Sequence, residues 1–224
     1  MGAPATNRLI TRVIYTLSNN PNTKFSDWVA YKVTPQTIGK SKKRTWKPDP
    51  ELKPENTLEP PDYKGAHKHL HTDRGHQAPL ASFAGTKYWK QTNYLSNITP
   101  QKSALNQGAW VKLENKVRVL AKKIGAVWVM TGPLYRKEMG TLPGADEPHK
   151  APSGYWKIVI VKTPGAPHAY ELAAFIFPQT AARKDSFCKY ISTVKEVSEA
   201  SKLQFTVYGS RRNLLCTNKV AVHK

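Results

Sequence analysis

The sequence predicts an α+β fold in which helices pack on a central β-sheet. Residues 28–33 alternate Val29, Tyr31 and Val33 with smaller or polar residues, the pattern of a half-buried strand. A long segment in the middle of the chain has the period of a helix instead. Apolar segments that follow it predict four further strands, at residues 127–132, 155–163, 171–179 and 203–209.

Residues 100–125 predict a long amphipathic helix. Their large apolar residues follow one another at alternating steps of three and four, which places them on one buried stripe. The residues of this stripe are Trp110, Leu113, Val117, Leu120 and Ile124. Gly125 is suited to end the helix. A weaker apolar spacing over residues 193–203 predicts a second, shorter helix.

Residues 35–72 are rich in proline, lysine and polar side chains and have no sustained period, so we expect a long, ordered surface loop. A chain of 224 residues suits one domain over residues 1–224, large enough to bury a core without the help of a metal. No window approaches the roughly 20 apolar residues that a bilayer-crossing helix needs, so we expect no membrane contact.

The chain is strongly basic. Its 35 lysines and arginines against 15 acidic residues give a formal net charge of +20. A field of this strength attracts polyanions, and nucleic acid is the leading partner. Part of the charge lies in the run KSKKR at residues 40–44. A generally basic surface on a secreted protein is the other interpretation of this composition.

The two cysteines, Cys188 and Cys216, lie far apart and belong to no CxxC pair, which argues against a zinc site built from them. One disulfide is the favoured interpretation and implies an oxidising compartment, while two buried free thiols are the alternative. The first residues lack the pattern of a signal peptide. We therefore expect a secreted, extracellular or periplasmic protein in its mature form, with a cytoplasmic protein as the alternative.

Candidate functional residues occur in two places. Residues 73–82 (DRGHQAPLAS) place a histidine beside an arginine and a glycine, so His76 is either an ordinary loop residue or a general base held against an anionic substrate. On the long predicted helix, Asn106, Glu114 and Arg118 fall at steps of eight and four and so project from nearly one face. The alternative for that face is a solvated surface with a Glu114–Arg118 ion pair.

The run DRGHQAPLAS, followed by NYLSNITPQKSALNQGAWVKLE at residues 93–114, resembles the DNA/RNA non-specific endonucleases with a ββα-metal motif, most of all the secreted Serratia-type members. The similarity continues through WVAYKVT, RTWKPDP, TGPLY, LPG and YWK and covers most of the chain. It implies a central, mainly antiparallel β-sheet flanked by helices, with one hairpin and the long helix forming the catalytic motif.

The resemblance implies a role for each matching residue. His76 matches the general base, Asn106 the one direct protein ligand of a magnesium ion, and Glu114 a residue that orders metal-bound water. Asp73 completes the tetrad DRGH, residues 73–76, and receives only a structural role. The arginines that bind or neutralise the phosphate correspond to Arg44, Arg74 and Arg118, and the supporting asparagines near the site to Asn93 and Asn97.

These residue types suit phosphodiester hydrolysis. A histidine with its ordinary pKa of ~6.5 accepts a proton from water near neutral pH without a large shift. Magnesium prefers oxygen ligands and keeps several waters, so one amide oxygen with a carboxylate in the outer shell is a suitable site, and manganese is expected to substitute. Contacts to phosphate carry no base information, so we expect cleavage of single- and double-stranded DNA and RNA to 5′-phosphorylated products.

The net charge exceeds what is typical of this family, and phosphate binding weakens as salt rises. We therefore expect tolerance of high salt, with an activity optimum shifted towards it. The main alternative function is a non-catalytic basic protein that binds nucleic acid. The resemblance leaves the oligomeric state open between a monomer and a homodimer.

Other histidines belong to no strong pattern. His67, His69 and His71 recur at period two, which would align them on one strand face as zinc ligands, but no glutamate or cysteine stands at ligand spacing. Ordinary exposed loop histidines are the favoured interpretation. His149 and His168 have no partner in the sequence pattern and are expected at the surface.

Overall fold

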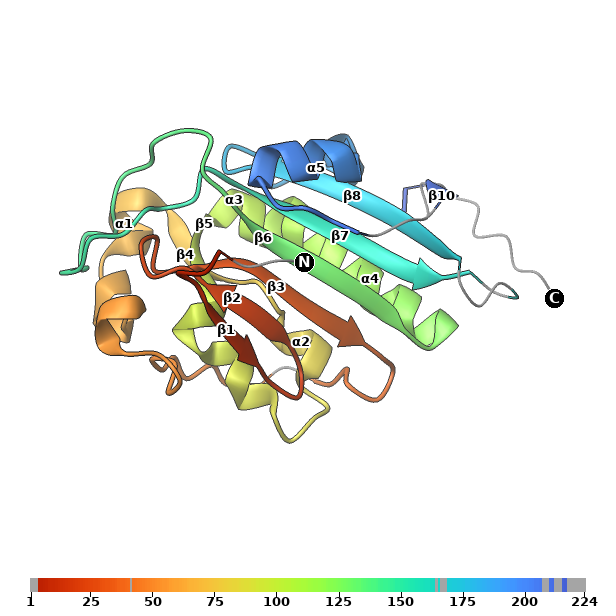
Figure 1. Ribbon diagram of the computed structural model, residues 1–224, viewed down its shortest axis with the longest axis horizontal. Helices are drawn as coiled ribbons and strands as arrows, with labels where there is room; N and C mark the ends of the chain where they lie inside the picture. The colour runs from red at the N-terminus through yellow and green to blue at the C-terminus, as the bar shows by residue number, and fades with distance from the viewer. Residues whose placement is uncertain are drawn as a thin grey trace.

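A large β-sheet runs through the centre of the molecule and carries helices on both faces (Figure 1). This computed structural model describes residues 4–40, 42–163, 165, 169–206, 210–211 and 215–216. The strands of the sheet are β1 (Arg8–Thr11), β2 (Thr16–Asn19), β3 (Ser26–Val33), β6 (Val127–Leu134), β7 (Gly154–Lys162), β8 (Tyr170–Pro178), β9 (Ile191–Ser192) and β10 (Ser210–Arg211).

The sheet is mainly antiparallel, as predicted. Its order is β1-β2-β3-β6-β7-β8-β10, and β9 pairs with β8 beside this path. Every neighbouring pair is antiparallel except β8 and β10, which are parallel. Strands from the two ends of the chain therefore share one sheet.

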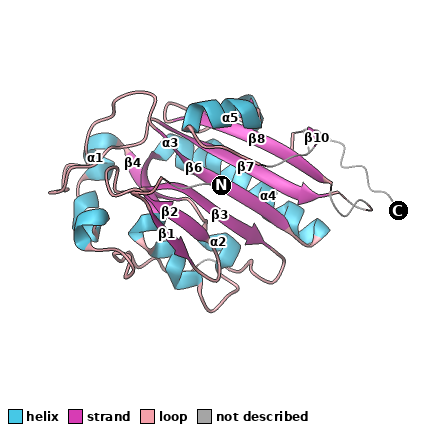
Figure 2. Cartoon of the chain, in the orientation of Figure 1, coloured by secondary structure: helices cyan, strands magenta, loops and turns pink. Residues whose placement is uncertain are grey.

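Different helices cover the two faces of the sheet (Figure 2), and each face buries its own cluster of apolar side chains. One face packs against α4 (Val111–Ile124), and alternate residues of β3 point into it, with Val29 and Val33 fully buried as predicted. We call this the α4-side cluster. The other face packs against α5 (Val194–Ser201), the shorter predicted helix, whose Val197 is fully buried.

The strand predictions for residues 127–132, 155–163 and 171–179 are confirmed by β6, β7 and β8. The prediction for residues 203–209 is wrong for 203–206, which form no strand, while 207–209 lie outside the described residues. Leu203 and Phe205 instead pack against the cluster under α5, so their apolar character reflects burial without strand pairing.

The predicted helix over residues 100–125 is confirmed in its second half, is interrupted in its first, and is wrong for residues 100–102, which belong to the strand β5 (Ile98–Lys102). A three-residue helix α3 (Ser103–Leu105) leads into a π-helical turn (Asn106–Trp110), and α4 follows. Gly108 leaves helical geometry, with φ −110° and ψ −116°. The chain passes close to another segment there, because a Cβ at Gly108 would lie 2.7 Å from the carbonyl oxygen of Arg183.

Four of the five residues predicted for the helical stripe are buried. They are Trp110, Leu113, Val117 and Leu120. The prediction that Ile124 is buried is wrong, since 43% of the surface of this residue is exposed. It is the last residue of α4, and the chain turns away directly after it at Gly125, the predicted stop, whose φ is +89°.

A separate two-stranded hairpin precedes this helical region. It pairs β4 (Thr72–His76) with β5 (Ile98–Lys102), with Asp73 opposite Gln101 and His76 opposite Ile98. A Cβ at Gly75 would lie 2.7 Å from the Cβ of Gln101, so glycine permits the close approach of the two strands. Because β5 runs directly into α3, the hairpin and the helical region form the predicted ββα arrangement.

Residues 35–72 are more structured than the predicted surface loop. They contain two 3₁₀ helices, Pro54–Asn56 and Pro60–Tyr63, and the helix α1 (Ala66–Leu70). Leu58 and Tyr63 are buried in a third apolar cluster with Phe25, which explains why proline-rich sequence still orders. The remaining helices are α2 (Leu80–Phe83) and the 3₁₀ helices Trp89–Asn93, Leu95–Asn97 and Phe187–Tyr190.

Cys188 and Cys216 form the predicted disulfide. His149, which was expected at the surface, is half-buried, and its Nε2 accepts a hydrogen bond from the backbone nitrogen of Leu142 at 2.9 Å. His168 lies outside the described residues. Among the helices that the structure describes, none combines the length and the apolar character needed to cross a membrane.

Candidate active site

A cleft of about 670 Å³ opens where the hairpin, α1 and the start of α4 meet. Six of the residues predicted for the site line it: Arg44, Arg74, His76, Asn106, Glu114 and Arg118. Asn93 and Asn97 are not part of its wall. They lie behind it and contact the segment that carries the histidine.

His76 occupies the last position of β4. Its Nε2 lies 3.2 Å from Oδ1 of Asn93, and with that oxygen as acceptor Nε2 is the donor and Nδ1 the basic nitrogen. The ring of Trp46 lies 5.3 Å from the His76 ring, centroid to centroid. Burial and, to a smaller extent, the charge of Arg44 lower the pKa of His76 to about 4, against the opposing hydrogen bond to Asn93. The expectation of a nearly ordinary pKa is therefore wrong.

Asn97 is fully buried, and both the nitrogen and the oxygen of its side-chain amide form hydrogen bonds with backbone groups. Its Nδ2 donates to the carbonyl oxygens of Ala78 and Thr92 at 2.9 and 2.8 Å, and its Oδ1 accepts from the Ala78 nitrogen at 2.8 Å. These bonds hold the chain two residues beyond His76. The place of Asn97 in the fold is thus that of a support for the histidine.

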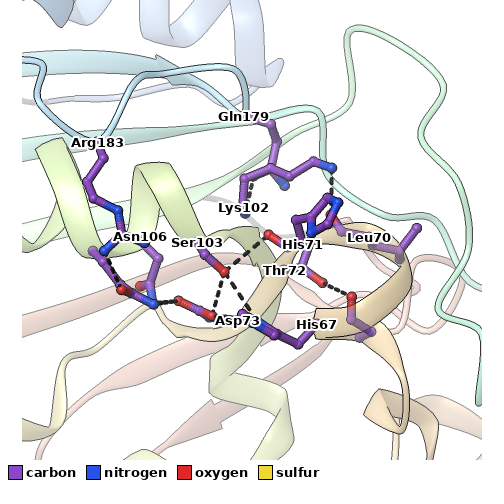
Figure 3. A network of polar contacts seen from close by, with 12 residues as sticks. His67, Leu70, His71, Thr72, Asp73, Lys102, Ser103, Asn106, Gln179 and Arg183 are labelled. Carbon is purple, nitrogen blue, oxygen red and sulfur yellow. Dashed lines mark hydrogen bonds and ion pairs between the residues drawn. The ribbon is translucent and has the colours of Figure 1, made fainter.

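Asp73 is the centre of a polar network that joins the hairpin to the helical region (Figure 3). Its Oδ2 accepts hydrogen bonds from Asn106 and Gln107, both at 2.8 Å, and its Oδ1 accepts one from Ser103 at 2.7 Å. His67 on α1 lies 3.4 Å from the same carboxylate. Burial opposes ionisation, but these hydrogen bonds hold the pKa of Asp73 below its usual value.

The Asp73 network orients Asn106. The amide nitrogen of Asn106 donates to Asp73. No hydrogen bond to Oδ1 of Asn106 occurs within the described chain, so this oxygen remains free as an acceptor. The prediction that Asn106, Glu114 and Arg118 share one face assumed a continuous helix. The turn at Gly108 interrupts that helix, yet all three side chains still line the cleft.

Glu114 and Arg118 lie one turn apart on α4 but form no ion pair within 4.0 Å among the described residues. Arg118 instead donates to Oδ1 of Asn115 and, at 3.5 Å, to the hydroxyl of Ser82. Burial raises the pKa of Glu114, and Lys157 and Arg118 oppose this rise. The alternative of an ordinary surface pair is therefore wrong.

Arg74 is held between two aromatic rings. Its guanidinium carbon lies 5.7 Å from the ring centroid of Trp46 and 5.1 Å from that of Tyr63, and its Nη2 donates to the carbonyl oxygen of Pro60 at 3.1 Å. Burial lowers the pKa of Arg74. No carboxylate within the described ranges pairs with this cation, so it can receive an anionic group.

The donor set of the cleft suits a magnesium ion. The free amide oxygen of Asn106 and the carboxylate of Glu114 are oxygen ligands, and the cleft has room for the waters that magnesium retains. The predicted zinc alternative is not supported, because His67 and His69 lie on α1 and share no strand face. A second group of carboxylates, Asp62, Asp146 and Glu147, lies outside the cleft wall. The sequence pattern did not single it out, and we assign it no role.

Comparison with known proteins places this chain in a family. Residues 1–211 match the family model described as DNA/RNA non-specific endonuclease. The chain belongs to this family. It is 49% identical over 201 residues to a nuclease of Serratia marcescens, an alignment that covers 89% of this chain and 75% of that protein.

More distant relatives also match this chain over most of its length. The chain is 26% identical to human mitochondrial endonuclease G, over 91% of its own length and 71% of that protein. A crystal structure of the EndoG/EndoGI complex has the same fold, with a TM-score of 0.77 and 24% identity over 91% of this chain and 87% of the other. The protein is therefore an endonuclease, and the alternative of a non-catalytic binder is not supported.

Proposed function

We propose that this endonuclease depends on magnesium and hydrolyses phosphodiester bonds in single- and double-stranded DNA and RNA, leaving 5′-phosphorylated products. One observation carries the proposal. A histidine, an amide oxygen, a carboxylate and three arginines converge on one cleft, from segments far apart in the sequence: His76, Asn106, Glu114, Arg44, Arg74 and Arg118.

His76 acts as the general base. Its Nε2 is committed to Asn93, so Nδ1 takes the proton from the attacking water. With a pKa of about 4, caused by burial, the ring is neutral at physiological pH and available for this step. Asn97 supports the same segment from behind and so helps to fix the direction of the ring.

Asn106 would hold the magnesium ion directly through its free amide oxygen, and Glu114 would hold it through water. When bound, the ion supplies Lewis-acid stabilisation of the phosphate and of the departing oxygen. Asp73 keeps the Asn106 amide in the orientation that presents oxygen to the ion. We expect manganese to substitute, because it accepts the same oxygen ligands.

The arginines bind the phosphate. Arg74 contributes a half-buried cation without a carboxylate partner among the described residues, and Arg44 and Arg118 face the same cleft. Their charge stabilises the crowded anionic phosphorus as the bond breaks. Because these contacts read phosphate and not bases, cleavage has little dependence on sequence or sugar.

The setting of the enzyme follows from the same features. The Cys188–Cys216 disulfide favours an oxidising compartment, so we propose a secreted, extracellular or periplasmic protein. We further propose that residues 1–224 form a single domain that acts as a monomer or a homodimer, and that the net charge of +20 supports activity at high salt.

Digestion of supercoiled plasmid and of RNA tests this function. The protein is expected to nick both with magnesium and neither with EDTA, and His76→Ala is expected to cleave at least about 100-fold more slowly. His69→Ala is the matched control, since His69 is exposed and outside the cleft wall. A His76→Ala variant as active as the parent, or retention of plasmid on a gel without nicking, would refute the proposal.

A further inference from the structure

One charged residue is buried in the middle of an apolar row. The side of β7 that faces α4 carries Tyr155, Lys157, Val159 and Val161, all buried, and Lys157 is only 1% exposed. An ammonium group loses its hydration at such a place, and the fold tolerates this loss only where other groups compensate. The surroundings of Lys157 show what compensates it.

Three groups surround the Lys157 ammonium. Its Nζ lies 3.9 Å from the ring centroid of Trp110, a cation–π contact, and donates to the hydroxyl of Tyr31 at 3.4 Å. Tyr31 is itself fixed by an edge contact with Phe83. The third group is Glu114. Burial lowers the pKa of Lys157 to about 8, and the negative charge of Glu114 opposes this fall, although no ion pair within 4.0 Å joins the two side chains in the described chain.

Trp110 connects this buried charge to the cleft. It ends the π-helical turn that begins with Asn106, and Glu114 follows four residues later, one helical turn along the same face. Lys157 therefore supports the helical region between the two residues that we assign to the metal. Its charge also faces Glu114 from the sheet, while Arg118 faces Glu114 from its own helix and Arg44 adds a further positive charge.

We propose that Lys157 is a positioning residue of the nuclease, whose buried ammonium group holds Trp110 and the carboxylate of Glu114 in the places that the divalent cation requires. This inference rests on the proposed function of Asn106 and Glu114. Lys157 does not line the cleft and touches no reacting group. It acts through Trp110 and Glu114, from the sheet side of the site.

The test compares cation binding and turnover in Lys157→Met, which keeps the length of the side chain and removes its charge. Binding of Mn²⁺ is measured by electron paramagnetic resonance of the free ion, and plasmid cleavage gives kcat and KM. We expect Mn²⁺ affinity and kcat to fall by roughly 10- to 100-fold, the usual effect of losing a group that orients a metal site, with KM for DNA little changed. Val159→Ala is the matched control, since Val159 lies on the same face of β7 and is equally buried.

Several results would overturn the inference. Tighter Mn²⁺ binding by Lys157→Met would show that the ammonium merely repels the cation, and losses equal to those of Val159→Ala would show a merely structural role. A parent protein that binds Mn²⁺ but cleaves nothing would contradict the proposed function, and its Mn²⁺ titration would still decide the role of Lys157.

A double variant covers the case in which Lys157→Met does not fold. If the charges of Lys157 and Glu114 are coupled, Lys157→Met combined with Glu114→Gln regains stability, because neither charge is then left alone. We also expect the double variant to bind Mn²⁺ no more weakly than Glu114→Gln does by itself. A double variant as unstable as Lys157→Met, or one whose losses in Mn²⁺ binding add, contradicts the proposal.

Discussion

The carboxylate of Asp73 accepts a hydrogen bond from the amide nitrogen of Asn106 across a distance of 2.8 Å. The first residue lies in β4 and the second at the start of the π-helical turn, so this bond joins the two halves of the ββα arrangement. It also decides which end of the Asn106 amide faces the cleft. An amide that rotated by half a turn would present its NH₂ group, which cannot bind a cation.

Replacing Asp73 with asparagine is expected to reduce magnesium-dependent cleavage by roughly 10- to 100-fold, because the orientation of the metal ligand is then less well determined. Cleavage rates at increasing Mg²⁺ concentrations measure this effect. Ser103→Ala is the control, since it removes a hydrogen bond to the other oxygen of Asp73 and leaves the Asn106 contact in place. Equal activity of Asp73→Asn and the parent would contradict the orienting role.

The stability of the protein is expected to fall as the pH falls from about 6.5 to about 4. Burial keeps His76 neutral in the folded protein down to a pKa of about 4, whereas a histidine in the unfolded chain has its ordinary pKa near ~6.5. Within this window the unfolded state binds more protons, so acid favours unfolding, by on the order of 3 kcal/mol at the lower limit.

Urea unfolding of the parent and of His76→Gln at pH 7 and pH 4.5 measures this effect. Glutamine does not titrate, so the free energy of unfolding of the variant is expected to improve relative to the parent at the lower pH. A difference between the two proteins that stays constant with pH would show that His76 is not held neutral by the fold.

The cleavage rate is expected to rise and then fall as NaCl increases. At low salt a protein of this charge holds its product, and at high salt it loses its substrate. Neutralising the exposed Lys42 and Lys43 together to glutamine is expected to move the optimum to lower salt. Lys195→Gln, on α5 at the opposite face of the sheet, is the control. A cleavage rate of the parent that only decreases as NaCl increases would contradict this prediction.

Loss of the disulfide is expected to destabilise the protein by about 3.5 kcal/mol, from the loop entropy of a 28-residue separation. Urea unfolding of Cys188→Ser and of the parent with and without a reducing agent measures it. Neither cysteine lines the cleft, so activity is expected to persist wherever the variant remains folded. An activity loss without a change in stability would point to a role in the site.

The spacing of apolar residues along the sequence predicted individual strands and helices of the fold. The alternation of Val29, Tyr31 and Val33 identified β3, and the spacing of Leu113, Val117 and Leu120 identified the buried stripe of α4. Such patterns succeed because a strand or helix repeats its contact with the core at a fixed interval. They failed for residues 203–206, where burial occurs without regular structure.

The details of the site depended on contacts between distant segments. The turn at Gly108 exists because the chain near Arg183 passes within contact distance, and no spacing rule contains that information. The low pKa of His76 reflects its enclosure, with Trp46 from a separate loop against the ring. In the same way, the strand pattern of residues 155–163 gave Lys157 no special place, and only the fold shows that it is buried beneath Trp110.

The sequence alone was enough to predict the α+β class, the four longest strands (β3, β6, β7 and β8), the main helix α4 and the basic character, and it supplied the residues that we propose to bind a metal and a phosphate. Only the tertiary structure decided how those residues are oriented and how their protonation is set. The physical reason is that side-chain type and period are local properties of a chain. Desolvation, hydrogen-bond direction and close backbone approach arise only when segments far apart in sequence meet.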